Sequence, residues 1–264
     1  MTGRIALLPI AFLVAACAST PTTSPAVSEA SASPTAAAVA SVAAPASASV
    51  VPSPSVPVWM DPANFTTTID NPWLPFVPGT VMTYRGTKDG EPGVETFTVT
   101  AQTKVISGVT CVVIDDRNTL SGVLEEKTFD YYVQDIAGNV WYFGEDTQEL
   151  NEKGKVVSTE GTWHAGVDGA VPGIFMPAEP KVGDTFQQEF YKGHAEDNFQ
   201  VLALSAAVKV PFGSFNDALQ TKEWTPLEPD VLDNKFYVRG VGEVKEASVK
   251  GPVERLELVK VMKP

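Results

Sequence analysis

The two histidines of the chain limit the chemistry that it could perform. His194 lies in YKGHAEDNF, where Glu196 and Asp197 follow it closely. An imidazole and two carboxylates in one short loop could bind a divalent cation such as Ca²⁺. The spacing matches no known metal-binding loop, however, and a glycine beside adjacent acids is equally typical of a solvated hairpin turn. His194, Glu196 and Asp197 are therefore the candidate metal ligands, and we expect no other cofactor.

A second pair of acids, Glu145 and Asp146, directly follows an aromatic run. Carboxylates beside aromatic rings are typical of sites that hydrolyse sugars. Adjacent residues of a strand point to opposite faces, so these two cannot both flank one glycosidic bond. The partner carboxylate of such a hydrolase would have to be Asp168, Glu196 or Glu223. The G-x-S-x-G, H-E-x-x-H, C-x-x-C and Walker patterns are absent from the sequence, and we predict no catalytic residue.

The aromatic residues of the segment 138–180 are the candidate ligand-binding residues. The segment contains WYFGED and TWHAGVDGAVPGIFMP, and long irregular segments between strands often hold binding sites. Trp141 and Phe143 would share one strand face and Tyr142 the other, so at least one large ring could face a groove. Trp163 completes the set. Packing in the core is the alternative role for all four side chains.

The N-terminus carries the clearest localisation signal of the sequence. Residues 1–16, MTGRIALLPIAFLVAA, combine one basic residue, an apolar core and a small-residue exit, which is typical of a secretory signal peptide. The next residue is Cys17, and the sequence around it resembles the bacterial lipobox, in which the cysteine is acylated before cleavage. This resemblance implies an exported protein, lipid-anchored to the bacterial cell membrane or to the outer membrane. A plain signal peptide without lipidation is the alternative.

A linker joins this anchor to the rest of the chain. Residues 17–57 are almost wholly Ala, Ser, Thr, Pro and Val, a composition that cannot bury enough surface to fold. The whole chain has 19 Lys and Arg against 32 Asp and Glu, for a net charge of −13. Such acidity argues against nucleic-acid binding. Cys111 lies in the apolar run VTCVVID, where we expect a buried, inert thiol.

Residues 58–264 form the folded domain, in which apolar and polar residues alternate. Alternation over runs of five to nine residues predicts antiparallel strands. Turn residues separate the runs, and DPANF at 61–65 is the one candidate helical turn. The turn segments are 86–93, 106–108, 135–139, 151–155, 211–215 and 239–242. The extended segment Asn71 to Phe76 should lie over the domain, because its prolines remove hydrogen-bond donors from any ladder.

The domain also shows weak internal similarity. A shift of 105 residues aligns 80–133 with 185–238 without a gap, and Tyr132 and Val133 then meet Tyr237 and Val238. We interpret this as a duplicated β-meander with repeats over 80–148 and 185–262. The alternative is that any two alternating β segments look alike.

Two segments carry a resemblance to known proteins. FDYYVQDIAGNVWYFGEDT at 129–147 and FYVRGVGEVKE at 236–246 resemble a group of uncharacterised bacterial lipoproteins. The second segment is also similar to hairpins of LolA/LppX-like half-barrel proteins. The resemblance implies a curved sheet with a concave apolar face for acyl chains or lipids. The chain departs from that pattern because it lacks helices to fill the concavity.

These features predict an all-β fold with a curved antiparallel sheet, a half-barrel or an open barrel. The expected role is the binding of a small hydrophobic or lipid-like ligand at the cell envelope, without catalysis. A carboxylate-based hydrolase is the alternative, favoured if acids with raised pKa values cluster in a cleft. A surface module for structure or protein interaction is a third interpretation. The expected partners are a membrane, through the lipid, and the ligand.

Overall fold

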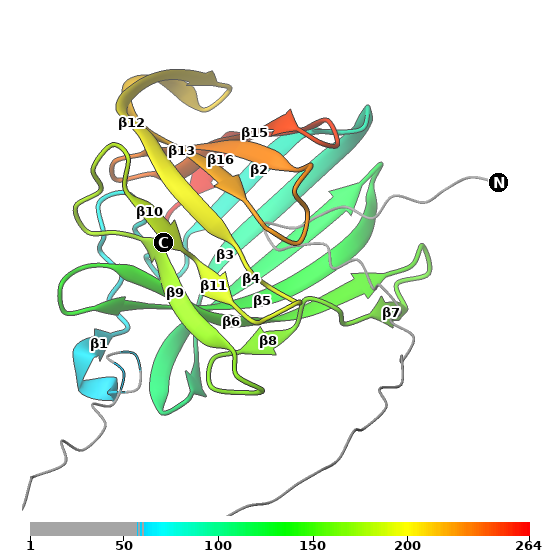
Figure 1. Ribbon diagram of the computed structural model, residues 1–264. Helices are drawn as coiled ribbons and strands as arrows, with labels where there is room; N and C mark the ends of the chain where they lie inside the picture. Colours follow the sequence, from blue (N-terminus) through cyan, green and yellow to red (C-terminus); the bar gives the residue numbers. More distant parts are fainter. Residues whose placement is uncertain (1–56, 58, 60) are drawn as a thin grey trace, which may run out of the picture. The chain divides into compact units, whose positions relative to one another are not determined.

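The computed structural model describes residues 57, 59 and 61–264. The predicted signal peptide, Cys17 and most of the predicted linker lie outside these residues. Strands dominate the described chain, which has no α-helix (Figure 1). Accordingly, none of its helices has the length and apolar character needed to cross a membrane. The all-β prediction is confirmed, and the predicted helical turn is the 3-10 helix η2 (Pro62–Asn64), capped by the side chain of Asp61.

All sixteen strands belong to one antiparallel sheet. They are β1 (Phe65–Thr66), β2 (Val81–Lys88), β3 (Glu91–Ile106), β4 (Val109–Leu120), β5 (Val123–Asp135), β6 (Val140–Leu150), β7 (Val156–Ser158), β8 (Trp163–His164), β9 (Val171–Met176), β10 (Thr185–Gln187), β11 (Glu189–Phe190), β12 (Asn198–Val210), β13 (Gly213–Trp224), β14 (Leu232–Val238), β15 (Gly242–Lys250) and β16 (Glu254–Met262).

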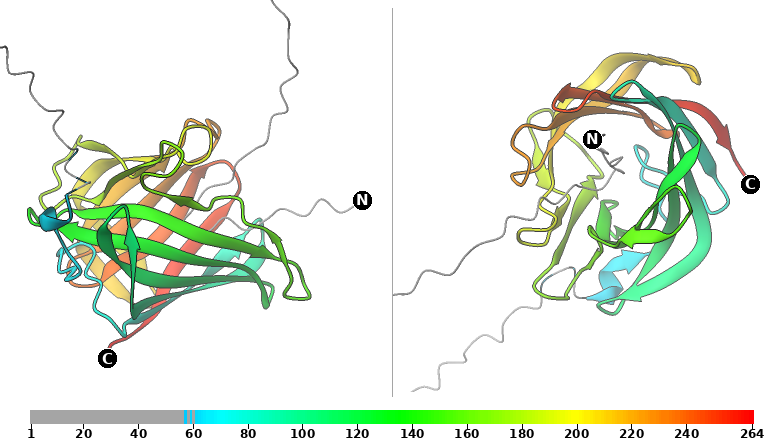
Figure 2. Two further views of the ribbon diagram at one scale, coloured as in Figure 1. Left: turned by 90° about the horizontal axis from the view of Figure 1, so that it is seen from below. Right: turned by 90° about the vertical axis from the view of Figure 1, so that its right-hand side faces the viewer.

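The sheet curls until its two ends almost meet, as the view in the right panel of Figure 2 shows. The strand order is β10-β12-β13-β14-β15-β16-β2-β3-β4-β5-β6-β9-β11, with β1, β7 and β8 attached to β5 and β6. β10 pairs with β12, whereas β11 pairs with β9. Since β10 and β11 are separated by Gln188 alone, one short stretch of chain spans both ends of the sheet. The result is a barrel with an incompletely paired seam.

Short turns explain why consecutive strands pair. Three hairpins turn through two residues with positive φ, namely Asp89 and Gly90, Ser107 and Gly108, and Ser121 and Gly122. This conformation is typical of type I′ turns, whose twist matches that of the flanking strands. Each of the six predicted turn segments contains a break between two strands. The meander therefore follows from local turn chemistry.

The segments 80–133 and 185–238 both fold as meanders. The shift of 105 residues places β3 over β12, β4 over β13 and the start of β5 before β14. Their registers differ, because β12 shifts register against β13 at three points and β3 shifts against β4 at one. The duplication remains a prediction.

The segment Asn71 to Phe76 packs into the core of the barrel. Trp73, Leu74 and Phe76 are buried in the core. Asn71 anchors the segment, because its side chain donates to the carbonyl oxygens of Gly138 and Pro177 at 2.9 and 3.2 Å. The same side chain accepts from the Trp73 amide at 2.9 Å. The segment therefore lies against the barrel interior, but the predicted extended conformation is wrong: Leu74 donates its amide to the Asn71 carbonyl oxygen at 3.2 Å in a turn, and Phe76 pairs back with Ile69.

Gly173 controls the closure of the seam and gives the first prediction. A Cβ atom at Gly173 would lie 2.1 Å from the carbonyl oxygen of Gln187, so only glycine lets β9 approach β10 this closely. We expect Gly173→Ala to lower the free energy of unfolding by about 1–3 kcal/mol, because backbone must move. Urea denaturation measures the loss.

The matched control for this change is Gly93→Ala in β3. A Cβ atom there would meet nothing nearer than the carbonyl oxygen of Thr119, at 3.9 Å. Its effect on the free energy of unfolding should stay within about 0.5 kcal/mol. Equal effects of the two substitutions would contradict the role assigned to Gly173.

Candidate functional site

Strand alternation places many acidic side chains inside the barrel. Glu95 and Asp116 lie on the same strand faces as neighbouring apolar residues of β3 and β4, and Asp130 lies on the same face of β5 as Tyr132. Across the described residues, ten carboxyl side chains are buried but only two lysines are. The ten are Glu95, Asp116, Glu126, Asp130, Asp135, Glu145, Glu189, Asp197, Glu223 and Glu243. Burial raises the pKa values of Glu95, Asp116 and Glu145 well above their usual range, which favours the protonated forms of these groups.

The two buried lysines are already engaged elsewhere. Lys235 Nζ lies 3.2 Å from Glu223 Oε2 and 3.8 Å from Glu246 Oε2. Lys88 Nζ lies 3.9 Å from Glu254 Oε2, near the hairpin ends of β2 and β16. Neither lysine forms an ion pair with the inward acids Asp116, Asp130 and Glu145. These three acids therefore have no ion-pair partner among the buried lysines.

A cavity opens into the barrel and is lined in part by the segment Asn71 to Phe76. It has about 520 Å³ of empty space, counting the solvent at its opening. Its lining is mainly apolar and aromatic, with three acids and one threonine. The lining residues are Leu74, Phe76, Met82, Tyr84, Phe97, Asp116, Thr128, Asp130, Tyr132, Phe175, Gly242 and Glu243. An apolar cavity with a few polar groups is typical of small-molecule sites.

Asp116 and Asp130 form the polar centre of this cavity. β4 and β5 pair Asp116 with Thr128 and Ile114 with Asp130, so the two acids are diagonal neighbours on the inner face. Burial, reinforced by the charge of Asp130, raises the pKa of Asp116 well above its usual value. Burial also raises the pKa of Asp130 to about 7, against a hydrogen bond from Tyr142 Oη at 2.7 Å. One oxygen of Asp116, Oδ1, has no hydrogen-bond partner.

A second group of acids lies around Glu145, whose strand partners are Asp130 on β5 and Trp163 on β8. Burial and the nearby charges of Glu189 and Asp130 raise the pKa of Glu145 well above its usual value. Burial raises the pKa of Glu189 to about 8. Glu145 Oε2 accepts from Thr147 Oγ1 at 2.9 Å, but Glu145 Oε1 has no partner. The group of interior acids thus extends beyond the cavity.

A β-bulge explains how Glu145 comes to face inward. β5 and β6 pair Tyr132 with Tyr142 but Asp130 with Glu145, so two residues of β6 oppose one residue of β5. Gly144 lies in this bulge with φ 133°, and a Cβ atom there would lie 2.2 Å from the carbonyl oxygen of Trp163. The bulge turns Glu145 to the same face as Tyr142, although strict alternation would separate them.

The predicted ligand-binding aromatics divide between two faces. Tyr142 points inward, where it stacks on Tyr132 at 4.7 Å and contacts Trp163 edge-on at 5.5 Å. Trp141 and Phe143 pack edge-on against Phe65 of β1, at 6.0 and 5.4 Å. The predicted placement of Trp141 and Phe143 on one strand face and of Tyr142 on the other is confirmed. None of the four candidate rings lines the cavity itself, and Trp141 and Phe143 serve packing.

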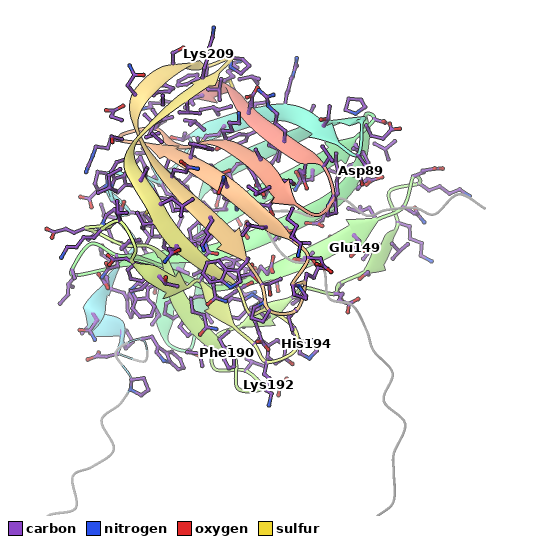
Figure 3. All side chains as sticks on the ribbon, turned by 45° about the horizontal axis from the view of Figure 1, so that its top comes forward. Asp89, Glu149, Phe190, Lys192, His194 and Lys209 are labelled. Atoms are coloured by element: carbon purple, nitrogen blue, oxygen red, sulfur yellow. The ribbon has the colours of Figure 1, made fainter. Side chains whose placement is uncertain are left out.

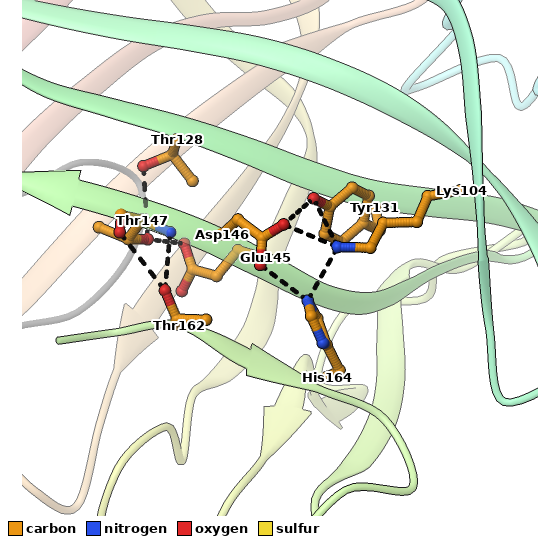
Figure 4. A network of polar contacts seen from close by, with 8 residues as sticks. All are labelled: Lys104, Thr128, Tyr131, Glu145, Asp146, Thr147, Thr162 and His164. Carbon is orange, nitrogen blue, oxygen red and sulfur yellow. Dashed lines mark hydrogen bonds and ion pairs between the residues drawn. The ribbon is translucent and has the colours of Figure 1, made fainter. Parts of the chain in front are cut away.

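The acid adjacent to Glu145 belongs to a separate network on the outer face (Figure 4). Asp146 accepts from Lys104 Nζ at 2.7 Å, from Tyr131 Oη, and lies 2.9 Å from His164 Nε2. Partial burial opposes its ionisation, but the Lys104 and Tyr131 hydrogen bonds outweigh burial and lower the pKa of Asp146. The network holds an ion pair and no activated nucleophile. The predicted opposite orientation of Glu145 and Asp146 is confirmed.

The structure does not bring the candidate metal ligands together. His194 is exposed at the rim, in the turn after β11, and stacks on Tyr191 at 4.3 Å (Figure 3). Glu196 accepts from the Gly193 amide at 2.7 Å, which is the ordinary hairpin-turn role, and Asp197 is buried. Within residues 57, 59 and 61–264, no group of three or more His, Cys, Asp and Glu side chains could hold a metal ion.

Cys111 is buried and free, as expected. Burial raises the pKa of its thiol to about 12, so the thiolate is scarce at neutral pH. Of the carboxylates proposed as partners of Glu145, Glu223 is buried but paired with Lys235. Sequence reasoning missed Asp116, Asp130, Glu189 and Glu243, although acids two residues from an inward aromatic, as in DYY at 130–132, were a usable signal.

Comparison with known proteins adds two distant structural likenesses. No protein-family model matches the chain, and no curated protein does. A "putative exported protein with YmcC-like fold" from Bacteroides fragilis is 15% identical, with a TM-score of 0.44, over 72% of this chain and 99% of that one. A "putative lipoprotein" from Parabacteroides distasonis is 12% identical, with a TM-score of 0.39, over 72% and 98%. Likenesses of this size carry no argument about function.

The raised pKa values predict an unusual pH dependence of stability. The folded domain holds the Asp130 proton up to about pH 7, whereas an unfolded aspartate releases it near pH 4. Raising the pH from about 5 to about 8 should therefore destabilise the fold, and Asp130→Asn should remove on the order of 2 kcal/mol of that loss. Urea denaturation across this range measures it.

Asp146→Asn is the control for the same experiment. The pKa of Asp146 is lowered, so this group is ionised in both folded and unfolded states throughout the range. The substitution should weaken the fold about equally at every pH and leave the slope unchanged. A wild-type domain that gains stability between pH 5 and 8 would contradict the account.

Proposed function

We propose that this domain binds a small organic ligand in the barrel cavity at the cell envelope, without chemical conversion. The observation that carries the proposal is the cavity itself, with Phe76, Met82, Phe97 and Phe175 around a polar centre. Apolar walls supply binding energy through burial, and a few polar groups orient the ligand.

The sequence supports an envelope location for this activity. The signal-like segment 1–16 and Cys17 imply export and lipid anchoring, and the linker that follows would separate the barrel from the membrane surface. An anchored binding domain of this kind would capture a ligand outside the cytoplasm. The acidic composition keeps such a domain soluble.

A carboxylate-based hydrolase is the second candidate. It is favoured by Asp116 and Asp130, which line one cavity and both have raised pKa values. Acid–base catalysis would require one of the two carboxyl groups to be ionised while the other is protonated. Turnover of a co-purified ligand by the wild-type protein, abolished by Asp130→Asn, would favour this candidate over binding.

Substitution of the predicted acylation site tests the anchor. Cys17→Ser removes the thiol that lipidation requires. We expect the wild-type protein to partition into the detergent phase of a Triton X-114 extract and the variant to partition into the aqueous phase, because one diacylated cysteine dominates the affinity for membrane. Equal partitioning of both proteins into the aqueous phase would contradict the proposal.

Native mass spectrometry tests the cavity. The intact chain carrying Cys17→Ser should retain a ligand when purified without detergent, and the additional Phe97→Trp should reduce its occupancy by roughly tenfold, because the larger ring fills the cavity. The matched control is Phe129→Trp, since Phe129 is packed at the partly exposed outer side of β5 beside Lys127. A bare polypeptide mass for the wild-type chain, or equal loss in both variants, would count against ligand binding in the cavity.

A further inference from the structure

We propose that the ligand of the cavity carries a protonated amine, which binds between Asp116 and Asp130 while its apolar body lies against the phenylalanine walls. This inference rests on the proposed function and names the chemical class of its ligand. It is drawn from the position of the two acids, from an unpartnered carboxyl oxygen and from the missing cation. Together these observations specify the charge and the hydrogen-bonding character of the ligand.

The first observation is that the polar centre contains a carboxyl oxygen, Asp116 Oδ1, that no donor of the described chain satisfies. Asp116 is 3% exposed, lines the cavity, and leaves Oδ1 without a hydrogen-bond partner. A buried polar atom of this kind is costly unless a bound group completes it. Asp130, its diagonal neighbour, also lines the cavity and accepts at Oδ1 from Tyr142 Oη. A primary ammonium has three donors and could bridge both acids.

The second observation is that further buried acids, with no cation beside them, lie behind this pair. Glu145 and Glu189 are 1% and 0% exposed, and each is close enough to Asp130 for their charges to interact. Lys235 pairs with Glu223 and is not available to them. A cation that enters this site would favour ionisation of a neighbouring acid, because opposite charges attract much more strongly at low dielectric constant than in water. A neutral or anionic ligand offers no such compensation.

The third observation separates an organic cation from a metal ion. Among the residues that the structure describes, no three His, Cys, Asp or Glu side chains converge as metal ligands. Aromatic rings, by contrast, border the acids. Tyr132 and Phe175 contact each other edge-on at 5.1 Å, and both line the cavity beside Asp130. Aromatic faces stabilise ammonium groups and also pack against apolar carbon. The surroundings therefore favour an amine with an apolar body.

Calorimetry with two matched probes tests the inference on the intact chain carrying Cys17→Ser. The probes are 2-phenylethylamine and 2-phenylethanol, which share the apolar body and differ in the charged group. At pH 7 the amine should bind roughly tenfold or more tightly than the alcohol, because only the amine supplies a charge to the acids. Equal affinity for the two probes, or failure of the amine to bind, would overturn the inference.

Asp116→Asn tests the assigned contact. The substitution keeps the shape of the side chain but prevents it from ionising beside the ammonium, so it should weaken amine binding by roughly tenfold and alcohol binding much less. Retained alcohol binding also shows that the cavity is intact; if Asp116→Asn does not fold, Asp130→Asn replaces it. Asp146→Asn is the matched control, because Asp146 belongs to the outer network, and it should change neither affinity. An equal loss of amine affinity in this control would contradict the contact.

The same titrations distinguish the two proposals. If amine and alcohol bind equally and Phe97→Trp weakens both, the cavity binds ligands but the amine inference fails. If Ca²⁺ binds and displaces the amine, the acids form a metal site and the inference also fails. If native mass spectrometry finds a retained ligand that lacks a basic nitrogen, ligand binding stands and the amine is again excluded.

Discussion

Closure of a single antiparallel sheet on itself is the constraint on which the rest of this structure depends. Once β9 reaches β10 at the seam, every second residue of each long strand must point into a narrow interior. Small barrels usually fill this interior with apolar side chains. Here the inward positions include many acids, and the segment Asn71 to Phe76 packs into the core through Trp73. Glycine at 173 is necessary because any side chain there would collide with the backbone of Gln187.

The acidic interior is tolerated because most of its carboxyl groups are held protonated. Burial raises the pKa values of Glu95, Asp116 and Glu145 well above their usual range, so these groups act as hydrogen-bonding acids and not as fixed charges. Asp130 has a pKa of about 7, so it is partly ionised at neutral pH and can become fully ionised when a cation approaches. A barrel built only for stability would gain from apolar residues at these positions. The retained acids are explained more simply by a ligand.

The sequence predicted the general fold well and the site poorly, and the physical reason differs between them. Alternation and turn residues are local, so the strands, the hairpins at Ser107 and Gly108, and the opposite faces of Glu145 and Asp146 followed directly. Barrel closure depends on contacts between distant strands, which alternation does not specify. The bulge at Gly144 changed the face of one acid, and Asp197 is buried whereas His194 is exposed. Only the folded barrel shows that acids from seven different strands are buried together.

A high-resolution crystal structure of the protein as purified is the most direct test of the central claim, that the cavity holds an organic cation. The account predicts continuous density between the rings of Phe97 and Phe175, with one atom within hydrogen-bonding distance of Asp116 Oδ1 and of Asp130. Soaking with 2-phenylethylamine should place its nitrogen at that point. A cavity occupied by ordered water alone, before and after soaking, would contradict the account.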